Sequence, residues 1–408
     1  MPGTSSATGN GASAPGVTAR QIDVGALATL SGPVAADFAP IVPGVKAYLD
    51  MVNAHGGVYG RRIVLGHVAD DGSNPTTDTD LARTLVEQDH VFAIVGVATA
   101  FFSAATFLAQ SGTPTFGYAT EPNWSPAPNL FAAYGSIIDY SSTAPFFAYV
   151  AKRLHAHAAG VISYGIPQSS AECRVAITAF HKYGIRVGYA DLSVPYGSDL
   201  SSDVQHMKQA KVDFVVSCMD VPGNIELSRA LQQYGVKGVH QLWLDGYDES
   251  TLHRYSSLMQ GVYFIVEHVP FQASREFRHA FPGLDRYISV MGKYEPGYVD
   301  NEVAMDGWLS AALFVAGLRA AGPHPTQQGL VRAINDITDF TGGGLTTPVD
   351  WRIAHTTVTS PTCDAFVTVR GDRFDVTFNR GKDIWVCFPT SNPNVTHPVA
   401  PPPGSPGT

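Results

Sequence analysis

The chain has 408 residues, of which 45% are hydrophobic and 15% charged, so it can bury a large core and is long for a single domain. Its formal net charge of −9 argues against a nucleic-acid partner, which needs a basic face. No uninterrupted run of about 18 apolar residues is apparent, so no membrane-spanning helix is expected.

The first residues have the composition of a linker. Residues 1–19 are rich in Gly, Ser, Thr and Ala, which predicts a disordered segment. Residues 1–16 lack a charged start followed by an apolar stretch, so they are not predicted to be a signal peptide.

Apolar strands and helical patterns alternate from residue 22 onward. The first block is predicted to contain strands at 22–30, 91–96, 114–118 and 130–134, a strand before the acidic turn Asp70–Asp71, and helices around 45–54, 79–88 and 102–110. This alternation is typical of a parallel sheet with crossover helices, and therefore of the α/β fold class.

A second α/β block follows. Its predicted strands are 159–164, 186–192, 214–218, 241–244 and 261–266, and its predicted helices are 141–154, 171–183, 200–209, 224–234 and 251–255. A helical block comes next, with helices at 274–280, 284–294, 301–321 and 327–336. The residues alone leave open whether these helices form a third domain or return to cover the first sheet. A hairpin at 365–369 and 374–378 and a loose tail at 389–408 end the chain.

The stretch 30–96 resembles the opening of type I periplasmic binding proteins, specifically the branched-chain amino-acid (Leu/Ile/Val) branch of ABC-transporter substrate-binding proteins. The resemblance rests on Leu30–Pro33, 45–62, 70–75 and 91–96. It implies two doubly wound parallel-sheet lobes joined by a three-segment hinge, with a ligand cleft between them. The implied N-terminal lobe comprises 20–135 and 272–345. The implied C-terminal lobe comprises 136–271 and 346–388, including the hairpin.

Four cysteines allow three pairings. Cys363 and Cys387 flank the predicted hairpin, while Cys173 and Cys218 belong to elements that a doubly wound sheet can make neighbours. We therefore expect disulfides between 173 and 218 and between 363 and 387, and an oxidising, exported location. Four buried free thiols are the alternative.

Signatures of enzymes and cofactor sites are missing from the sequence. Neither a G-x-G-x-x-G turn nor a phosphate-binding G-x-x-x-x-G-K-[ST] loop occurs, and neither does G-x-S-x-G or H-E-x-x-H. His155 and His157 lie near a helix end without a third metal ligand, and residues 300–306 lack the spacing of a calcium loop. We expect no cofactor, no metal and no catalytic residues, and we interpret Asp70–Asp71 as a turn.

Ligands of α/β sheets bind beyond the carboxyl ends of the strands. These ends carry aromatic, hydroxyl and acidic groups without a catalytic pairing, which is typical of a binding pocket. The candidate ligand-binding residues are Phe38, Thr99, Ala100, Ser103, Tyr118, Ala119, Thr120, Tyr164, Gln168, Met219, Asp245, Gly246 and Tyr247.

The resemblance implies roles for several of them. Tyr118–Thr120 matches a segment whose alanine and threonine bind the ligand's amino and carboxylate groups. Thr99 or Ala100 stands where the family has a serine, and Asp245 matches an ammonium-binding acid. Tyr164 and Gln168 match a loop that closes on the ligand.

Ala100, Tyr118 and Asp37 depart from that pattern; Asp37 stands at an aromatic position, with Phe38 beside it. Small amides, hydroxy or keto acids and aromatic acids are therefore candidate ligands beside amino acids.

The resemblance implies an extracytoplasmic solute-binding protein that delivers a small molecule to ABC permease subunits after hinge closure. The implied location is the periplasm or, through a lipid anchor that this chain lacks, the cell surface. A ligand sensor of the same fold is the alternative, and an enzyme with an unrecognised site is a third hypothesis.

Overall fold

The computed structural model describes residues 14–141, 144–358, 360–390 and 394–408, and it divides into two compact units. The first unit comprises the chain up to Ile138, Tyr287–Gly343 and Val349–Thr357. The second comprises Asp139–Arg286, Gly344–Pro348 and the chain from Val358 onward.

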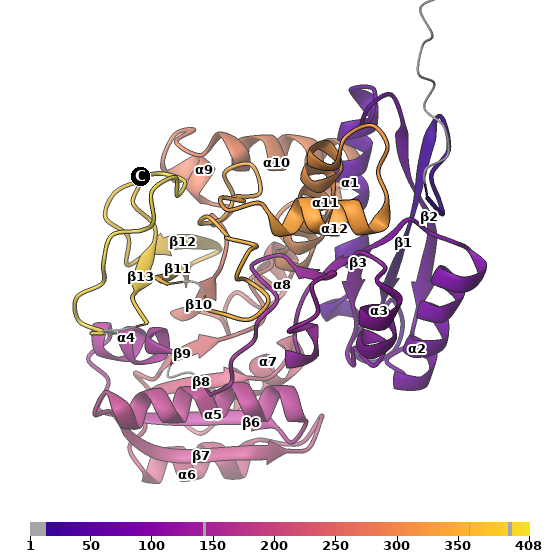
Figure 1. Cartoon of the computed structure of the whole chain (residues 1–408). Helices are drawn as coiled ribbons and strands as arrows, with labels where there is room; N and C mark the ends of the chain where they lie inside the picture. Colours follow the sequence, from indigo (N-terminus) through magenta and orange to yellow (C-terminus); the bar gives the residue numbers. More distant parts are fainter. Residues whose placement is uncertain (1–13, 142–143, 359, 391–393) are drawn as a thin grey trace, which may run out of the picture. The chain divides into compact units, whose positions relative to one another are not determined.

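The first unit is built on a five-stranded parallel sheet in the order β2-β1-β3-β4-β5 (Figure 1). Its strands are β1 (Gln21–Ala28), β2 (Arg62–Asp70), β3 (Ala93–Ala98), β4 (Thr115–Gly117) and β5 (Leu130–Ala132). Its helices are α1 (Ile41–Ala54), α2 (Pro75–Arg83), α3 (Ala105–Ser111), α11 (Glu302–Ala321) and α12 (Gln327–Asn335), and α10 (Pro282–Tyr294) leads into it from the second unit. Short 3-10 segments lie at Ala35–Asp37, Pro122–Trp124 and Pro296–Tyr298.

The last two helices of the predicted helical block return to the first sheet, since α11 packs against α1, β3 and β4 and also against α12. Glycines allow the close crossing of α1 and α11: a Cβ on Gly44 would lie 1.9 Å from the Ala304 carbonyl oxygen, and one on Gly307 would lie 2.1 Å from that of Ile41. By length and composition α11 also passes the test for a membrane-spanning helix, which the sequence analysis did not expect. Because 78% of its apolar window is buried inside the structure, we describe it as a core helix.

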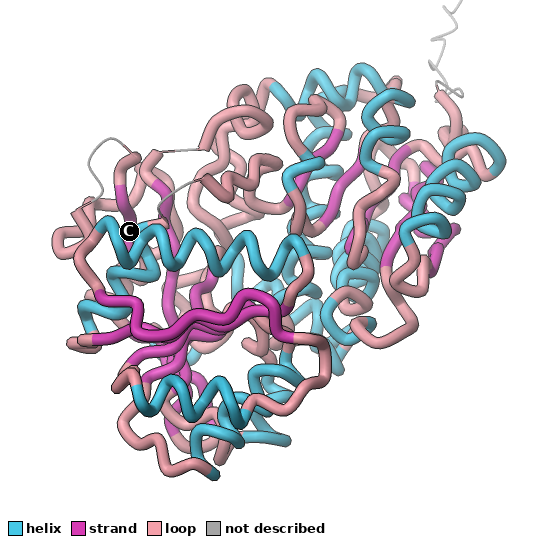
Figure 2. Tube along the Cα trace, turned by 90° about the horizontal axis from the view of Figure 1, so that it is seen from below, coloured by secondary structure: helices cyan, strands magenta, loops and turns pink. Residues whose placement is uncertain are grey.

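The second unit contains an eight-stranded mixed sheet in the order β12-β11-β10-β9-β8-β6-β7, with β13 paired to β11. The strands are β6 (Ala158–Tyr164), β7 (Arg186–Val194), β8 (Phe214–Cys218), β9 (His240–Trp243), β10 (Val262–Val266), β11 (Thr362–Arg370), β12 (Arg373–Thr377) and β13 (Val386–Phe388). The helices are α4 (Pro145–Arg153), α5 (Pro167–Lys182), α6 (Ser201–Gln209), α7 (Val221–Gln233), α8 (Glu249–Tyr255) and α9 (Ala273–Glu276). Helices lie on both faces of the strands β6 and β7 (Figure 2).

The structure differs from the predicted elements at several places. The predicted helix 79–88 is an α-helix from Pro75 followed by a π-helical turn at Thr84–Gln88, because the Asn74 side chain caps the earlier start by accepting from the N–H groups of Thr76 and Thr77. The predicted hairpin lies in the second unit, where it was expected, and β11 joins the second sheet antiparallel to β10. The third antiparallel strand, β13, was not predicted.

Residues 272–286 were predicted in the first lobe, but they belong to the second unit. Local hydrogen bonds hold them there. Tyr247 Oη donates to Gln272 Oε1 over 2.5 Å, and the Val376 N–H donates to Glu276 Oε1 over 3.0 Å.

Both predicted loose ends pack where they are described. Residues 1–13 of the predicted linker lie outside the described residues, but Val17 is 3% exposed and bridges Ile22. In the predicted tail, Val395 is 2% exposed, Val399 pairs with Cys387, and the Trp385 indole donates to the Pro406 carbonyl over 3.0 Å. Backbone bridges, one hydrogen bond to a backbone carbonyl and the buried side chains of Val17 and Val395 hold these segments, and composition alone does not predict such contacts.

Candidate functional site

The carboxyl ends of the first three strands of the first unit are joined by one buried hydroxyl. Thr29, directly after β1, donates to Asp71 Oδ1 over 2.6 Å and accepts from the Ala100 N–H over 3.1 Å. Asp71 follows β2, and Ala100 follows β3. The N–H of Ala100, one of the two residues at which the resemblance implies a serine, is thereby already satisfied within the chain.

Asp70 and Asp71, which the sequence predicts as a turn after a strand, also anchor the neighbouring loops. Asp70 Oδ1 accepts from the N–H groups of Leu30, Ser31 and Gly72 at 2.9, 3.2 and 3.0 Å. Burial alone would raise the pKa of Asp70, but these bonds and one from the Ser31 hydroxyl outweigh it and hold that pKa below its ordinary value. The loop after β1 is therefore held in place by a charged acceptor.

Two predicted aromatic residues meet at this end of the sheet. Phe38 and Tyr118 have ring centroids 6.5 Å apart, and both pack on a small apolar cluster formed by Ala28, Ile41 and Ala98. Tyr118 is oriented by its N–H, which donates to the Val97 carbonyl over 2.8 Å. The predicted residues Phe38 and Tyr118 thus come from separate loops to one half-buried apolar surface.

The remaining predicted residues of this unit lie in the loops after β3 and β4 and differ in exposure. Ala119 and Thr120 are half-buried beside Tyr118, Ala100 is half-buried, and Ser103 is exposed. Thr99 is 3% exposed, and its hydroxyl has no hydrogen-bond partner among the described residues. Hydroxyl and backbone groups next to an aromatic surface can bind a carboxylate or amide that carries an apolar group.

Sequence reasoning missed Asp78, which lies beneath the loop that follows β3. It is fully buried in α2, and its Oδ2 accepts from the Ala104 N–H over 2.7 Å. Burial raises the pKa of Asp78 to about 7, and the nearby charge of Asp71 adds to the effect. The only signal in the sequence is its position in the first turn of a capped helix, which by itself indicates a surface residue.

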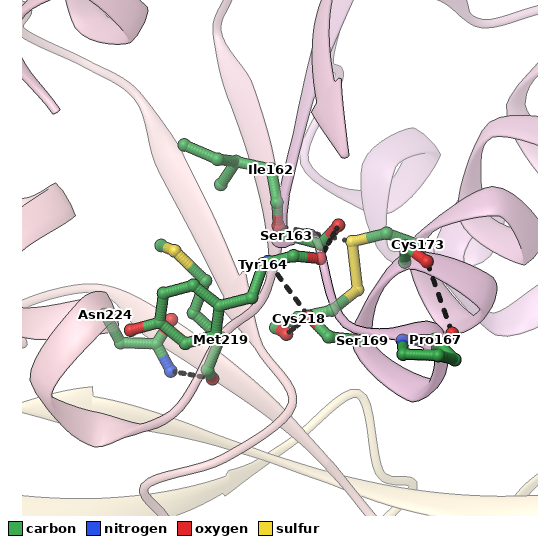
Figure 3. Close-up of a disulfide and its surroundings, with 10 residues drawn as sticks. Ile162, Ser163, Tyr164, Pro167, Ser169, Cys173, Cys218, Met219 and Asn224 are labelled. Carbon is green, nitrogen blue, oxygen red and sulfur yellow. Dashed lines mark hydrogen bonds between the residues drawn. A yellow bond between two sulfur atoms is a disulfide. The ribbon is translucent and has the colours of Figure 1, made fainter. Parts of the chain in front are cut away.

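In the second unit, the loop after β6 is tied to the end of β8. The Tyr164 N–H donates to Ser169 Oγ over 3.0 Å, and the Ser169 hydroxyl donates to the Cys218 carbonyl. A disulfide joins Cys173 on α5 to Cys218, with Cα atoms 5.9 Å apart, and Figure 3 shows these groups together. This disulfide and the second one, between Cys363 and Cys387, confirm both predicted pairings.

Tyr164 itself is oriented by a carboxylate. Its Oη donates to Asp220 Oδ1 over 2.8 Å, and the same oxygen caps α7 by accepting from the Gly223 N–H over 2.9 Å. Tyr196, from the loop after β7, lies beside Tyr164 with a centroid distance of 5.1 Å and is 53% exposed. Tyr164 is therefore one member of an aromatic pair whose other member, Tyr196, was not among the predicted residues.

Asp245 and Met219 are linked through one buried amide. Asn224 Nδ2 donates to the carbonyl oxygens of Met219 and Asp245 at 3.0 and 3.1 Å. Burial raises the pKa of the Asp245 carboxyl to about 7, and the neighbouring charge of Asp220 raises it further. A buried carboxyl with a raised pKa is suited to a cationic partner, because a nearby positive charge stabilises the ionised form and lowers the pKa toward its ordinary value.

Tyr247 has a core position instead. It is 1% exposed, stacks on Phe271 with centroids 5.2 Å apart, and accepts from the Phe271 N–H over 2.8 Å. Gly246 before it has φ of +112°, a backbone conformation that favours glycine. The packing of Tyr247 argues against the ligand contact predicted from its place after β9, and Gly246 provides the turn.

Among the residues that the structure describes, no group of three or more His, Cys, Asp or Glu side chains is arranged to hold a metal ion.

The groups described above lie in the loops that follow the strands, and a comparison with protein-family models identifies the family of the chain. The model described as "Periplasmic binding protein" matches residues 21–372. The chain belongs to the periplasmic binding protein family. A comparison with curated proteins finds no match.

Solved structures resemble this periplasmic binding protein over nearly their whole lengths. A fatty acid ABC transporter substrate-binding protein from Thermomonospora curvata is 18% identical with a TM-score of 0.73, covering 96% of this chain and 97% of its own. A branched-chain amino acid ABC transporter from Thermus thermophilus with bound valine is 16% identical, with a TM-score of 0.72 and coverages of 88% and 95%. A solute-binding protein from R. palustris in complex with benzoate is also 16% identical, with a TM-score of 0.70 and the same coverages. At these identities the likeness concerns the type I fold.

Proposed function

We propose that this protein is the extracytoplasmic solute-binding component of an ABC importer and that it captures an amino acid or a related small carboxylate or amide by hinge closure. The observation that carries the proposal is the meeting of Phe38 and Tyr118, from the loops after β1 and β4, in a chain of this family, with Thr120 two residues beyond Tyr118. Rings and hydroxyls beside one another suit a ligand with an apolar group and a polar end.

Each part of the proposed site has a stated role. Thr120 and neighbouring backbone groups bind the carboxylate or amide, and Phe38 and Tyr118 contact the apolar part. Asp245 holds an ammonium group if the ligand has one. The proteins of similar fold include one with bound valine, one with benzoate and one named for fatty acids, which supports an apolar group as the shared feature.

A thermal-shift screen tests the proposal. The purified protein is heated with branched-chain and other amino acids, short amides, hydroxy and keto acids, aromatic acids and fatty acids. A ligand at 100 times its Kd adds about 2.7 kcal/mol to the free energy of unfolding, which shifts the melting temperature measurably. Thr120→Ala is expected to abolish the shift, whereas Thr106→Ala, at an exposed position on α3, is the matched control.

The result also distinguishes ligand classes. If amino acids shift the melting temperature, Asp245→Asn should weaken their binding strongly because an ammonium group loses its counter-charge. If only acids or uncharged compounds do, Asp245→Asn should leave binding nearly unchanged. A melting temperature that no class of compound changes would contradict the proposal.

Delivery to permease subunits, attachment through a lipid anchor and the absence of catalysis belong to the same proposal. The alternative is a sensor of the same fold that binds a small amide or aromatic acid. Stimulation of a reconstituted permease's ATPase activity by the ligand-loaded protein supports transport. Ligand binding without such stimulation, together with a ligand-dependent change of mass in solution, supports the sensor.

A further inference from the structure

A cavity lies within the second unit, and its lining includes none of the residues described above at the carboxyl ends of β6, β8 and β9. It has a volume of about 360 Å³ and is lined by residues of α4, the loop between β12 and β13, the start of β13, and the C-terminal segment 395–400. The C-terminal segment, yellow in Figure 1, passes beside β13. Cavities of this size hold small organic ligands.

Three cationic side chains line this cavity. Lys152 and Arg153 come from the last turn of α4, and Arg380 comes from the loop after β12. Within the described part of the chain, none of the three makes an ion pair with a carboxylate at 4.0 Å or less. Complementing the dipole of α4 explains cations at Lys152 and Arg153, but it gives no reason for Arg380 to lie on the same cavity.

The walls between the cations are aromatic. Tyr149 and Phe378 pack edge to face with centroids 5.7 Å apart, and the Arg153 guanidinium lies 5.5 Å from the centre of the Phe378 ring. Tyr149 is near enough to both Arg153 and Arg380 for their charges to act on its hydroxyl. The two guanidinium groups therefore act on one region of the cavity wall, next to an apolar surface.

One acidic residue, Asp383, also lines the cavity. Its Oδ1 is buried and accepts no hydrogen bond from any described residue. A buried acceptor of this kind is satisfied by a donor on a bound molecule. The cavity thus offers three cationic groups, apolar walls and one acceptor.

We propose that this cavity is a second ligand site, for a small organic anion with an apolar body and a hydroxyl donor. Arg153, Arg380 and Lys152 bind the anionic group, Tyr149 and Phe378 contact the body, and Asp383 accepts from the hydroxyl. The site is independent of the proposed site on the strand ends, since it is lined by other elements.

Isothermal titration with 4-hydroxybenzoate tests the proposal on the full-length protein, and 4-hydroxybenzamide serves as the uncharged probe. The titration uses protein carrying Thr120→Ala and Tyr118→Ala, so that binding at the strand ends is suppressed. When Arg153→Gln and Arg380→Gln are added to this protein, the Kd of 4-hydroxybenzoate is expected to rise by about tenfold or more. The benzamide is expected to bind at least about tenfold more weakly than the acid.

Arg254→Gln combined with Lys237→Gln is the matched control, because it removes two exposed charges of the same unit that do not line the cavity. It should leave the Kd unchanged. The proposal is overturned if 4-hydroxybenzoate shows no saturable binding, or if the control weakens binding as much as the cavity variant does. Circular dichroism melting curves show whether each variant is folded.

Discussion

Tyr164 and Asp220 are joined by a 2.8 Å hydrogen bond from the phenol to the carboxylate, which connects the end of β6 to the start of α7. The neighbouring Gly223 leaves room for this bond. A Cβ on Gly223 would lie 2.3 Å from Tyr164 Oη and 2.9 Å from the Met219 Cβ. The position of one predicted ligand residue therefore depends on a glycine that contributes no side chain.

Gly223→Ala is expected to displace Tyr164 and to destabilise the protein by about 1–3 kcal/mol, because an added methyl group overpacks a filled site. Urea unfolding measures the change. Gly292→Ala is the control: its Cβ would meet nothing within 4 Å, and alanine should stabilise that helix by up to about 1 kcal/mol. Equal free energies of unfolding for the two variants would contradict the prediction, because they would mean that Tyr164 moves aside without destabilising the protein.

Thr29→Val keeps the shape of the side chain but removes the hydroxyl that serves both Asp71 and Ala100. It leaves a buried carboxylate oxygen and a backbone N–H without that partner, so we expect a loss of about 1–3 kcal/mol in the free energy of unfolding. The same substitution at exposed Thr106 should change stability by less than about 0.5 kcal/mol. Chemical denaturation of both variants distinguishes a buried link from a general effect of losing a threonine.

The carboxyl of Asp78 predicts a dependence of stability on pH. Its pKa of about 7 in the folded state exceeds the value of about 3.9 expected for unfolded aspartate, so folding favours the protonated form. Below about pH 4 the carboxyl is protonated in both states and does not lower the free energy of unfolding. As the pH rises toward and through 7, ionisation lowers the free energy of unfolding increasingly, by at most about 4 kcal/mol.

Asp78→Asn removes this titration and retains an oxygen acceptor for the Ala104 N–H. The stability of the wild type relative to Asp78→Asn is therefore expected to fall between pH 5 and pH 8, as measured by urea unfolding at each pH. Parallel curves for the two proteins would mean that Asp78 titrates near its ordinary pKa.

Removing the Cys173–Cys218 disulfide should lower stability markedly. Its cysteines are 45 residues apart, and closing a loop of that length in the unfolded chain corresponds to about 4 kcal/mol in the chain-entropy treatment. The double variant Cys173→Ala with Cys218→Ala should melt at a lower temperature than the wild type. Reduction of the wild type should lower its melting temperature as well, and an unchanged melting temperature in both experiments would contradict a stabilising role.

Local patterns predict most of the strands and helices because burial on both faces of a parallel strand requires a continuous apolar run, and a crossover helix repeats every 3.6 residues. Features that depend on a single hydrogen bond or on a very short segment leave no such repeating pattern in the sequence, so they are not predictable in this way. The early start of α2 depends on Asn74, and β13 is only three residues long. The Val395 and Val399 contacts of the C-terminal segment lie within a composition typical of a loose tail.

The sequence by itself determines the α/β class and the loops that hold Phe38, Tyr118, Thr120, Tyr164 and Asp245, since strand ends can be located from the apolar pattern. It favours the two cysteine pairs, which the tertiary structure then decides. Only the tertiary structure decides what each side chain of those loops contacts. Tyr247 turns into an aromatic core, Asp78 is buried beneath a loop, and Arg380 comes to lie on the same cavity as Arg153. The physical reason is that burial, pKa and partner depend on atoms from segments far apart in the chain, which a local pattern does not place.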